Sequence, residues 1–167
     1  KMLKGRRLQA FTDKLAQRLA FERGGTRLYD AVFAKAVAHT HELNAVSAQE
    51  IQDIRNSEAR HALLIKECLE SLGADPTAQT PSADLVGVQA SGLLQAASDP
   101  RTTLAQTLNT ALAAELIDNA GWENLILMAR QMDYDDMAER FEAALAEERI
   151  HLSKVKGWYN ALTIDTG

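Results

Sequence analysis

The chain has 167 residues, enough for one domain over 1–167 with a hydrophobic core of its own. The net charge of −5 argues against a nucleic acid or an anionic membrane as partner, and a single cysteine excludes an internal disulfide and an all-cysteine metal site. No apolar run is long enough to span a membrane and no signal peptide is visible, so we expect the cytoplasm as location.

The composition favours helix, because alanine and leucine are abundant and aromatic residues make up only 5%. The first predicted helix spans about 6–40, where apolar residues recur at steps of three and four. Glu22 lies on this apolar stripe, where burial of a carboxylate is costly unless a partner compensates it. Gly24 and Gly25 follow, and each costs up to about 1 kcal/mol inside a helix. They predict a bend or a close backbone approach; the alternative is a helix that ends at Arg23 and restarts.

The second predicted helix begins after Ser47, with Glu50 three residues later in the pattern of a capping box, and it ends at Gly73. Its apolar stripe contains two polar residues, Glu58 and His61. Both occupy positions that face the core rather than solvent.

A long connection over 73–100 contains all three prolines of the chain. Antiparallel neighbours in a helical bundle need only a few linking residues, so a connection of this length can travel along the whole bundle. The helix after it then runs parallel to the helix before it, as in bundles with a long crossover. A short helix over 84–97 is compatible with the pattern, although Gly87 and Gly92 weaken it.

The third predicted helix opens at Asp99-Pro100, with Asp99 as the N-cap and the proline at the first helical position. Glu115 lies on its apolar stripe, and Asp118 follows one turn later. A carboxylate again occupies a position that faces the core.

The fourth predicted helix begins near Asp135 and places Glu148 and His151 on its apolar face. This Glu-x-x-His spacing repeats that of Glu58 and His61. Residues three apart on a helix lie on one face about a turn apart. Each motif therefore presents a carboxylate beside an imidazole, two groups that commonly bind metal ions.

Six polar side chains thus face the interior of four predicted helices: Glu22, Glu58, His61, Glu115, Glu148 and His151. Burying isolated ionised carboxylates costs several kcal/mol each, and two divalent metal ions would supply four compensating positive charges. Two glutamates together with two Glu-x-x-His motifs form the ligand set of di-iron and di-manganese carboxylate bundles. The sequence therefore predicts an all-α four-helix bundle with a dinuclear metal site.

This pattern resembles the ferritin-like family, which includes ferritin, bacterioferritin and rubrerythrin. The order of the six residues along the chain is that of the family, and Tyr29, seven residues after Glu22, matches a tyrosine that the family often has beside the metals. The resemblance implies that Glu58 and Glu148 bridge two metal ions. The other four residues then complete the coordination of the two ions: Glu22 and His61 bind one ion, and Glu115 and His151 bind the other.

The function implied by the resemblance is redox chemistry at two iron ions, or at one manganese and one iron ion, with O2 or H2O2. The substrate stays open between Fe(II) itself, peroxide and an organic molecule, and Tyr29 is the candidate catalytic residue. Asp118 resembles an extra carboxylate of rubrerythrin, which favours peroxide slightly. The alternatives are a non-enzymatic protein for iron binding or storage, and a metal-free helical interaction module.

The same resemblance bears on assembly. The residues after His151 are too few for the separate fifth helix of cage-forming ferritins, and the crossover is longer than in bacterioferritin. We therefore expect a homodimer or a small homo-oligomer. The chain has no Cys-x-x-Cys module, which excludes a complete rubrerythrin.

Overall fold

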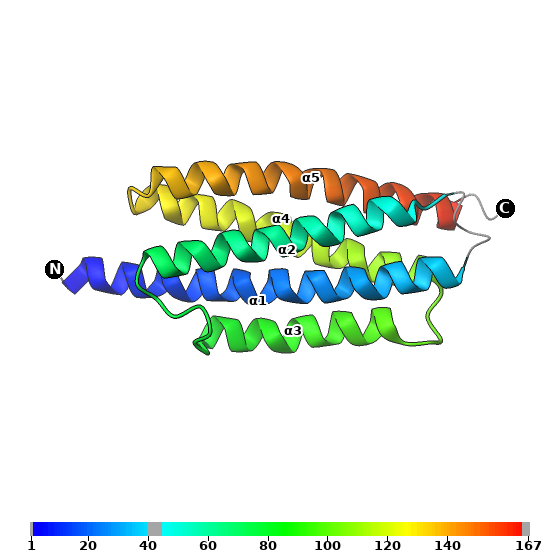
Figure 1. Cartoon of the computed structure of the whole chain (residues 1–167), viewed down its shortest axis with the longest axis horizontal. Helices are drawn as coiled ribbons and strands as arrows, with labels where there is room; N and C mark the ends of the chain where they lie inside the picture. Colours follow the sequence, from blue (N-terminus) through cyan, green and yellow to red (C-terminus); the bar gives the residue numbers. More distant parts are fainter. Residues whose placement is uncertain (1, 40–44, 165–167) are drawn as a thin grey trace.

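The structure, a computed structural model, describes residues 2–39 and 45–164, and within them it has five α-helices and no strand (Figure 1). The helices are α1 (Met2–Ala38), α2 (Ala48–Ser71), α3 (Pro81–Ser98), α4 (Leu104–Gln131) and α5 (Asp135–Ile164). The prediction of an all-α fold is confirmed. The predicted end of the first helix at residue 40 lies outside the described residues. No helix in the described part of the chain has an apolar stretch that would cross a membrane.

The helices lie lengthwise beside one another, and each runs in the opposite direction to the one before it (Figure 1). Helix α1 packs against α2, α3 and α4, and α5 packs mainly against α4. Because α3 leads the chain back along α1, helices α2 and α4 run parallel, as the long connection predicts. The crossover contains an 18-residue helix, longer than the short one expected.

Local sequence explains the length of α3. The Thr80 side chain caps its first turn by accepting a hydrogen bond from the backbone N–H of Ala83, and Pro81 occupies a first-turn position. Gly87 and Gly92 face open space, so neither disturbs a neighbour. Their cost in helix propensity is offset by the packing of α3 on α1 and α4.

The predicted start of the next helix at Asp99 is wrong. Asp99 follows the last residue of α3, and its side chain accepts a hydrogen bond from the backbone N–H of Arg101 at 2.8 Å, which stabilises a turn. Helix α4 begins at Leu104 instead, after a reciprocal capping box of Thr103 and Gln106. The two caps compete for the same segment, and the box satisfies two backbone donors.

The start of α2 matches the prediction in part. The Ser47 hydroxyl accepts a hydrogen bond from the backbone N–H of Glu50 at 3.2 Å. The Glu50 carboxylate pairs with Lys154 of α5 at 2.8 Å. The N-cap is therefore present, and the glutamate joins two helices.

Buried apolar side chains form two clusters at different heights along the helices. One cluster contains Leu28, Val32 and Leu108, and the other contains Leu15, Ile65 and Phe141. Between them, every one of α1, α2, α4 and α5 carries buried polar residues. The interior is thus divided into apolar, polar and apolar layers.

Helix α1 continues unbroken through Gly24 and Gly25, so the alternative of a helix that ends at Arg23 is wrong. The predicted close approach at these glycines is confirmed, but the atoms that come close are side-chain atoms rather than backbone. A Cβ atom on Gly25 would overlap Oε2 of Glu58, and a Cβ atom on Gly24 would lie 3.1 Å from Cβ of Ala90. The pair gives room to a carboxylate on one side and to α3 on the other.

Alanine substitution should have opposite effects at a glycine that ends a helix and at a glycine inside a helix. Gly73 ends α2 with a φ of 74°, a left-handed conformation that is strained for alanine. We expect Gly73→Ala to lower the free energy of unfolding by about 1–2 kcal/mol. Gly157, inside α5 and facing open space, is the matched control, and Gly157→Ala should raise it by about 0.5–1 kcal/mol. Urea denaturation followed by circular dichroism measures both, and equal shifts of one sign would contradict the assignment.

Candidate metal centre

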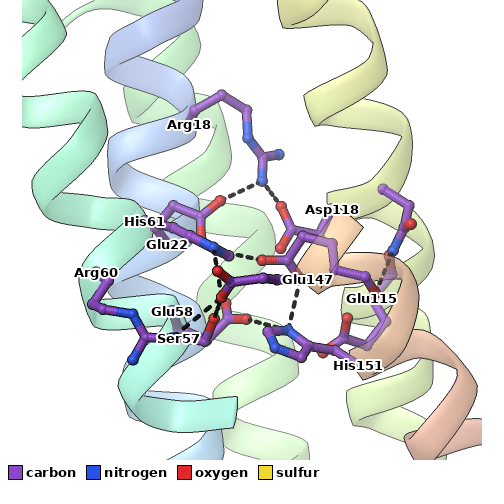
Figure 2. A network of polar contacts seen from close by, with 12 residues as sticks. Arg18, Glu22, Ser57, Glu58, Arg60, His61, Glu115, Asp118, Glu147 and His151 are labelled. Carbon is purple, nitrogen blue, oxygen red and sulfur yellow. Dashed lines mark hydrogen bonds and ion pairs between the residues drawn. The ribbon is translucent and has the colours of Figure 1, made fainter. Parts of the chain in front are cut away.

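Four helices bring six polar side chains into the buried layer between the two apolar clusters. Each of the six is at most 6% exposed. Helix α1 contributes one, α2 two, α4 one and α5 two: Glu22, Glu58, His61, Glu115, Glu148 and His151. Figure 2 shows Glu22, Glu58 and His61 facing Glu115 and His151 across the layer.

The six side chains form two groups that could each hold a metal ion. Within each group, one ligand atom from every residue lies within 4.8 Å of the others. The first group is Glu22, Glu58, His61 and Glu148, and the second is Glu58, Glu115, Glu148 and His151. The two groups share Glu58 and Glu148, so these two carboxylates stand between two candidate metal positions.

Both imidazoles turn Nδ1 towards the shared carboxylates. Nδ1 of His151 lies 3.0 Å from Oε2 of Glu148 and 3.3 Å from Oε1 of Glu58. Nδ1 of His61 lies 2.5 Å from Oε1 of Glu148 and 3.9 Å from Oε2 of Glu22. The Glu-x-x-His spacing on each helix therefore directs a nitrogen and an oxygen to the same point.

Burial and repulsion raise the pKa values of three carboxyl groups in this layer. For Glu22, burial is the largest cause and the charge of Glu58 the next, and its pKa lies well above the usual range. Burial and the charge of Glu148 raise the pKa of Glu58 to about 7. Burial, then the charges of Glu58 and Glu148, also raise the pKa of Glu115. Without a compensating cation, these groups hold protons more tightly than exposed glutamates do.

Glu148 behaves differently because both imidazoles contact it. Burial favours a higher pKa, but hydrogen bonds from His151 and His61 outweigh burial and lower the pKa of Glu148 to about 2. Burial likewise favours a lower pKa for His151, whereas its hydrogen bonds to Glu148 and Glu58 raise that pKa to about 10. The layer thus attracts positive charge around Glu148.

Two carboxylate oxygens of the cluster lack a hydrogen-bond partner among the described residues. They are Oε2 of Glu22 and Oε2 of Glu115. Buried polar atoms are normally paired, so these two call for a missing partner. Carboxylate oxygens and imidazole nitrogens suit divalent iron, manganese or zinc. The residues therefore fit a pair of divalent cations.

A family model described as a domain of unknown function, DUF892, matches residues 7–164. The chain belongs to the DUF892 family. The matched range contains all six side chains of the cluster. No curated protein and no solved structure matches the chain. The family description names no activity, so the chemistry of this DUF892 chain is inferred from its side chains.

A buried arginine that sequence reasoning missed stands beside the cluster of the DUF892 chain. Arg18 is 4% exposed, and its Nη2 lies 2.8 Å from Oε1 of Glu22 and in direct ion contact with Oδ1 of Asp118 (Figure 2). Its guanidinium carbon lies 5.8 Å from the ring centre of Trp122. A Cβ atom on Gly121 would collide with the guanidinium, so this glycine makes room for it. The available signal was a cation four residues before Glu22, on the same helix face.

Asp118 therefore pairs with Arg18 and belongs to neither candidate ligand group. Tyr29, on α1, is only 1% exposed. Its hydroxyl donates a hydrogen bond to Oε1 of Glu115. Burial, and then the negative charge of Glu115, raise the pKa of Tyr29 well above its usual value.

Two further polar residues support the cluster from outside. Oε2 of Glu147 lies 3.5 Å from Nε2 of His61 and accepts a hydrogen bond from the Ser57 hydroxyl. Nδ2 of Asn119 donates to the backbone oxygens of Glu115 at 2.9 Å and Glu148 at 3.2 Å, which ties α4 to α5. Both contacts fix the position or orientation of groups in the cluster.

The neighbouring Arg149 of the second Glu-x-x-His motif plays no such part. Its Nη2 pairs with the exposed Glu123 at 3.3 Å, on the surface between α4 and α5. Of the two residues that precede and follow Glu148, only Glu147 therefore reaches an imidazole of the cluster.

The ion pairs of Arg18 can be compared with an exposed pair on the same protein. We expect Arg18→Met to lower the free energy of unfolding of the metal-free protein by about 3–5 kcal/mol, because Asp118 and Glu22 lose a buried counterion. Arg149→Met removes an arginine from an exposed pair and should cost no more than about 0.5 kcal/mol. Guanidinium denaturation measures the two variants side by side. Equal effects would show that Arg18 is not a structural counterion.

Proposed function

We propose that this DUF892 chain is a ferritin-like protein that holds two iron ions, or one manganese and one iron ion, and reduces O2 or H2O2. In this proposal α1, α2, α4 and α5 form the four-helix bundle, and α3 covers it within the crossover. The observation that carries the proposal is the sharing of Glu58 and Glu148 by two four-residue groups. A single metal site needs one such group, whereas a dinuclear site needs two groups with common bridging ligands.

The charge of the cluster supports two ions rather than one. Four buried carboxylates carry up to four negative charges, and burial raises the pKa of three of them. Two divalent ions supply four positive charges. In the proposed site Glu58 and Glu148 bridge the ions. Glu22 with His61 then binds one ion, and Glu115 with His151 binds the other.

A pair of redox-active ions would supply the electrons for reducing the oxidant. The protein residues bind and orient the ions and exclude water, since the layer is closed by apolar clusters on both sides. Tyr29 acts through Glu115 in this proposal, because its hydroxyl donates a hydrogen bond to that ligand. This hydrogen bond orients the Glu115 carboxylate.

Iron binding or storage without catalysis is the second candidate function. The number of subunits in the assembly distinguishes storage from the redox function. We propose a homodimer or a small homo-oligomer for the redox protein. Exposed apolar side chains on α3 and α4 are consistent with a contact between copies: Leu85, Val88, Leu116 and Ile117. Light scattering would decide, since a closed shell of about two dozen subunits would favour storage.

The bridging assignment predicts the number of ions that each variant binds. In an anaerobic Fe(II) titration we expect two ions per wild-type chain and the loss of paired binding in Glu58→Ala and Glu148→Ala. His61→Ala should weaken one position by roughly 10- to 100-fold, by analogy with lost supporting groups. Glu123→Ala, an exposed change, is the control. Binding of one ion per wild-type chain would contradict the dinuclear site and indicate a mononuclear one. Binding of no ion would favour the metal-free helical interaction module.

The role of Tyr29 predicts a separation of binding from reactivity. We expect Tyr29→Phe to leave the Fe(II) content at the wild-type value and to slow reoxidation of the reduced protein, because only the hydroxyl on Glu115 is lost. Stopped-flow mixing with O2 or H2O2 measures the rate, with Tyr134→Phe as the matched control. If the reduced wild-type protein reacts with neither oxidant, the redox proposal is wrong.

A further inference from the structure

A small apolar hollow lies directly behind the cluster. It is formed where α1, α3 and α4 meet, and it is lined by Gly24 and Gly25 and by apolar side chains that include Leu28, Ala90 and Ala114. Its volume is about 10 Å³, close to that of one water-sized molecule. We call this space the inner hollow.

Gly25 touches both the inner hollow and a shared carboxylate of the cluster. It lines the hollow, and a Cβ atom on it would overlap Oε2 of Glu58. Because this position carries only hydrogen, the Glu58 carboxylate lies against the backbone that lines the hollow. The side chains that line the hollow are apolar, which favours a neutral apolar molecule over an ion.

A larger cavity at the surface adjoins the inner hollow. Its volume is about 480 Å³, and it lies between α1, α3 and the segment 76–79. We call it the outer cavity. The exposed residues Arg23 and Arg27 line it, which places it at the surface. Gly24 and Ala90 line both spaces, so the two are neighbours across this pair of residues.

The approaches from other sides have a different character. Half of the residues that line the groove between α1 and α2, about 390 Å³ in volume, are charged, among them Asp30, Arg55 and Lys66. The approach past Glu147 is polar, since Ser57 and Arg60 contact its carboxylate beside His61. That polar side suits cations and protons better than an apolar gas.

We propose that O2 reaches the metal centre through the outer cavity, past Gly24 and Ala90 into the inner hollow, and then past Gly25 to Glu58. Helix α3 forms the outer wall of this route, because it packs against α1 and α4 and supplies Ala90. The inference rests on the proposed function, because only that function makes O2 an oxidant at this site. The route itself is a property of the protein chain and is testable without metal.

The first test uses the full-length metal-free protein and dissolved O2 under pressure. Paramagnetic O2 speeds the nuclear relaxation of methyl groups that it approaches. We expect the enhancement at the Ala114 methyl to exceed that at the Ala129 methyl by about 3-fold or more, because an apolar hollow concentrates an apolar gas. Both alanines are buried in α4, but only Ala114 lines the hollow. Ala90→Phe should remove the difference, and equal enhancements in the wild type would overturn the route.

The second test uses the Fe(II)-loaded protein in stopped-flow mixing with O2. We expect Ala90→Phe to slow reoxidation by at least about 10-fold, or about 1.4 kcal/mol of added barrier, with the Fe(II) content unchanged. Gln89→Phe, at an exposed position of the same helix, should react at the wild-type rate. Ala90→Phe could slow the reaction by disturbing the packing of α3. Ala114→Leu therefore narrows the hollow from α4 instead, and it should slow reoxidation as well.

The two tests separate the route from the proposed function. Wild-type rates in both narrowed variants, with intact helix content, would overturn the route and leave the redox function standing. An iron-loaded wild type that ignores O2 would end the redox function with O2, and the relaxation measurement would still decide whether O2 follows this path.

Discussion

The structure depends on the balance of charge in one buried layer. Four glutamates lie there with two histidines, between two apolar clusters that keep water away. Desolvation alone would make four ionised carboxylates prohibitive. The protein meets this cost with two imidazoles around Glu148, with raised pKa values for the other three carboxyl groups, and with an arginine on Glu22. Two divalent cations would complete the compensation.

The backbone around the layer is adapted to these side chains. Gly25 stands where a Cβ atom would displace Glu58, and Gly121 stands where one would displace Arg18. A helix interior normally disfavours glycine, so these two positions lose helix propensity in return for placing a charged group. Gly24 has a similar role towards α3, because the absence of a side chain allows α3 to approach α1 closely at Ala90.

The two candidate metal positions have unequal surroundings. The position of Glu22 and His61 has Arg18 and Asp118 on one side and Glu147 on the other. The position of Glu115 and His151 has the Tyr29 hydroxyl on Glu115 and the Asn119 amide on the backbone of both glutamate-bearing helices. One position is therefore set among charged groups and the other among neutral hydrogen-bond donors. Two ions bound at these positions would therefore differ in affinity and, if they are redox-active, in potential.

Helical periodicity alone determined much of this protein. It placed Glu22, Glu58, Glu115 and Glu148 on core-facing stripes, because a period of 3.6 residues maps sequence spacing onto one face. The length of the 73–100 segment likewise indicated the crossover and the parallel course of α2 and α4. The start of α4 at Thr103 was also readable, because Thr103 and Gln106 have the spacing of a capping box. Only the tertiary structure decided which carboxylates belong to both groups and that Asp118 pairs with Arg18. These outcomes depend on distances between helices, which the spacing of residues along a single helix does not encode.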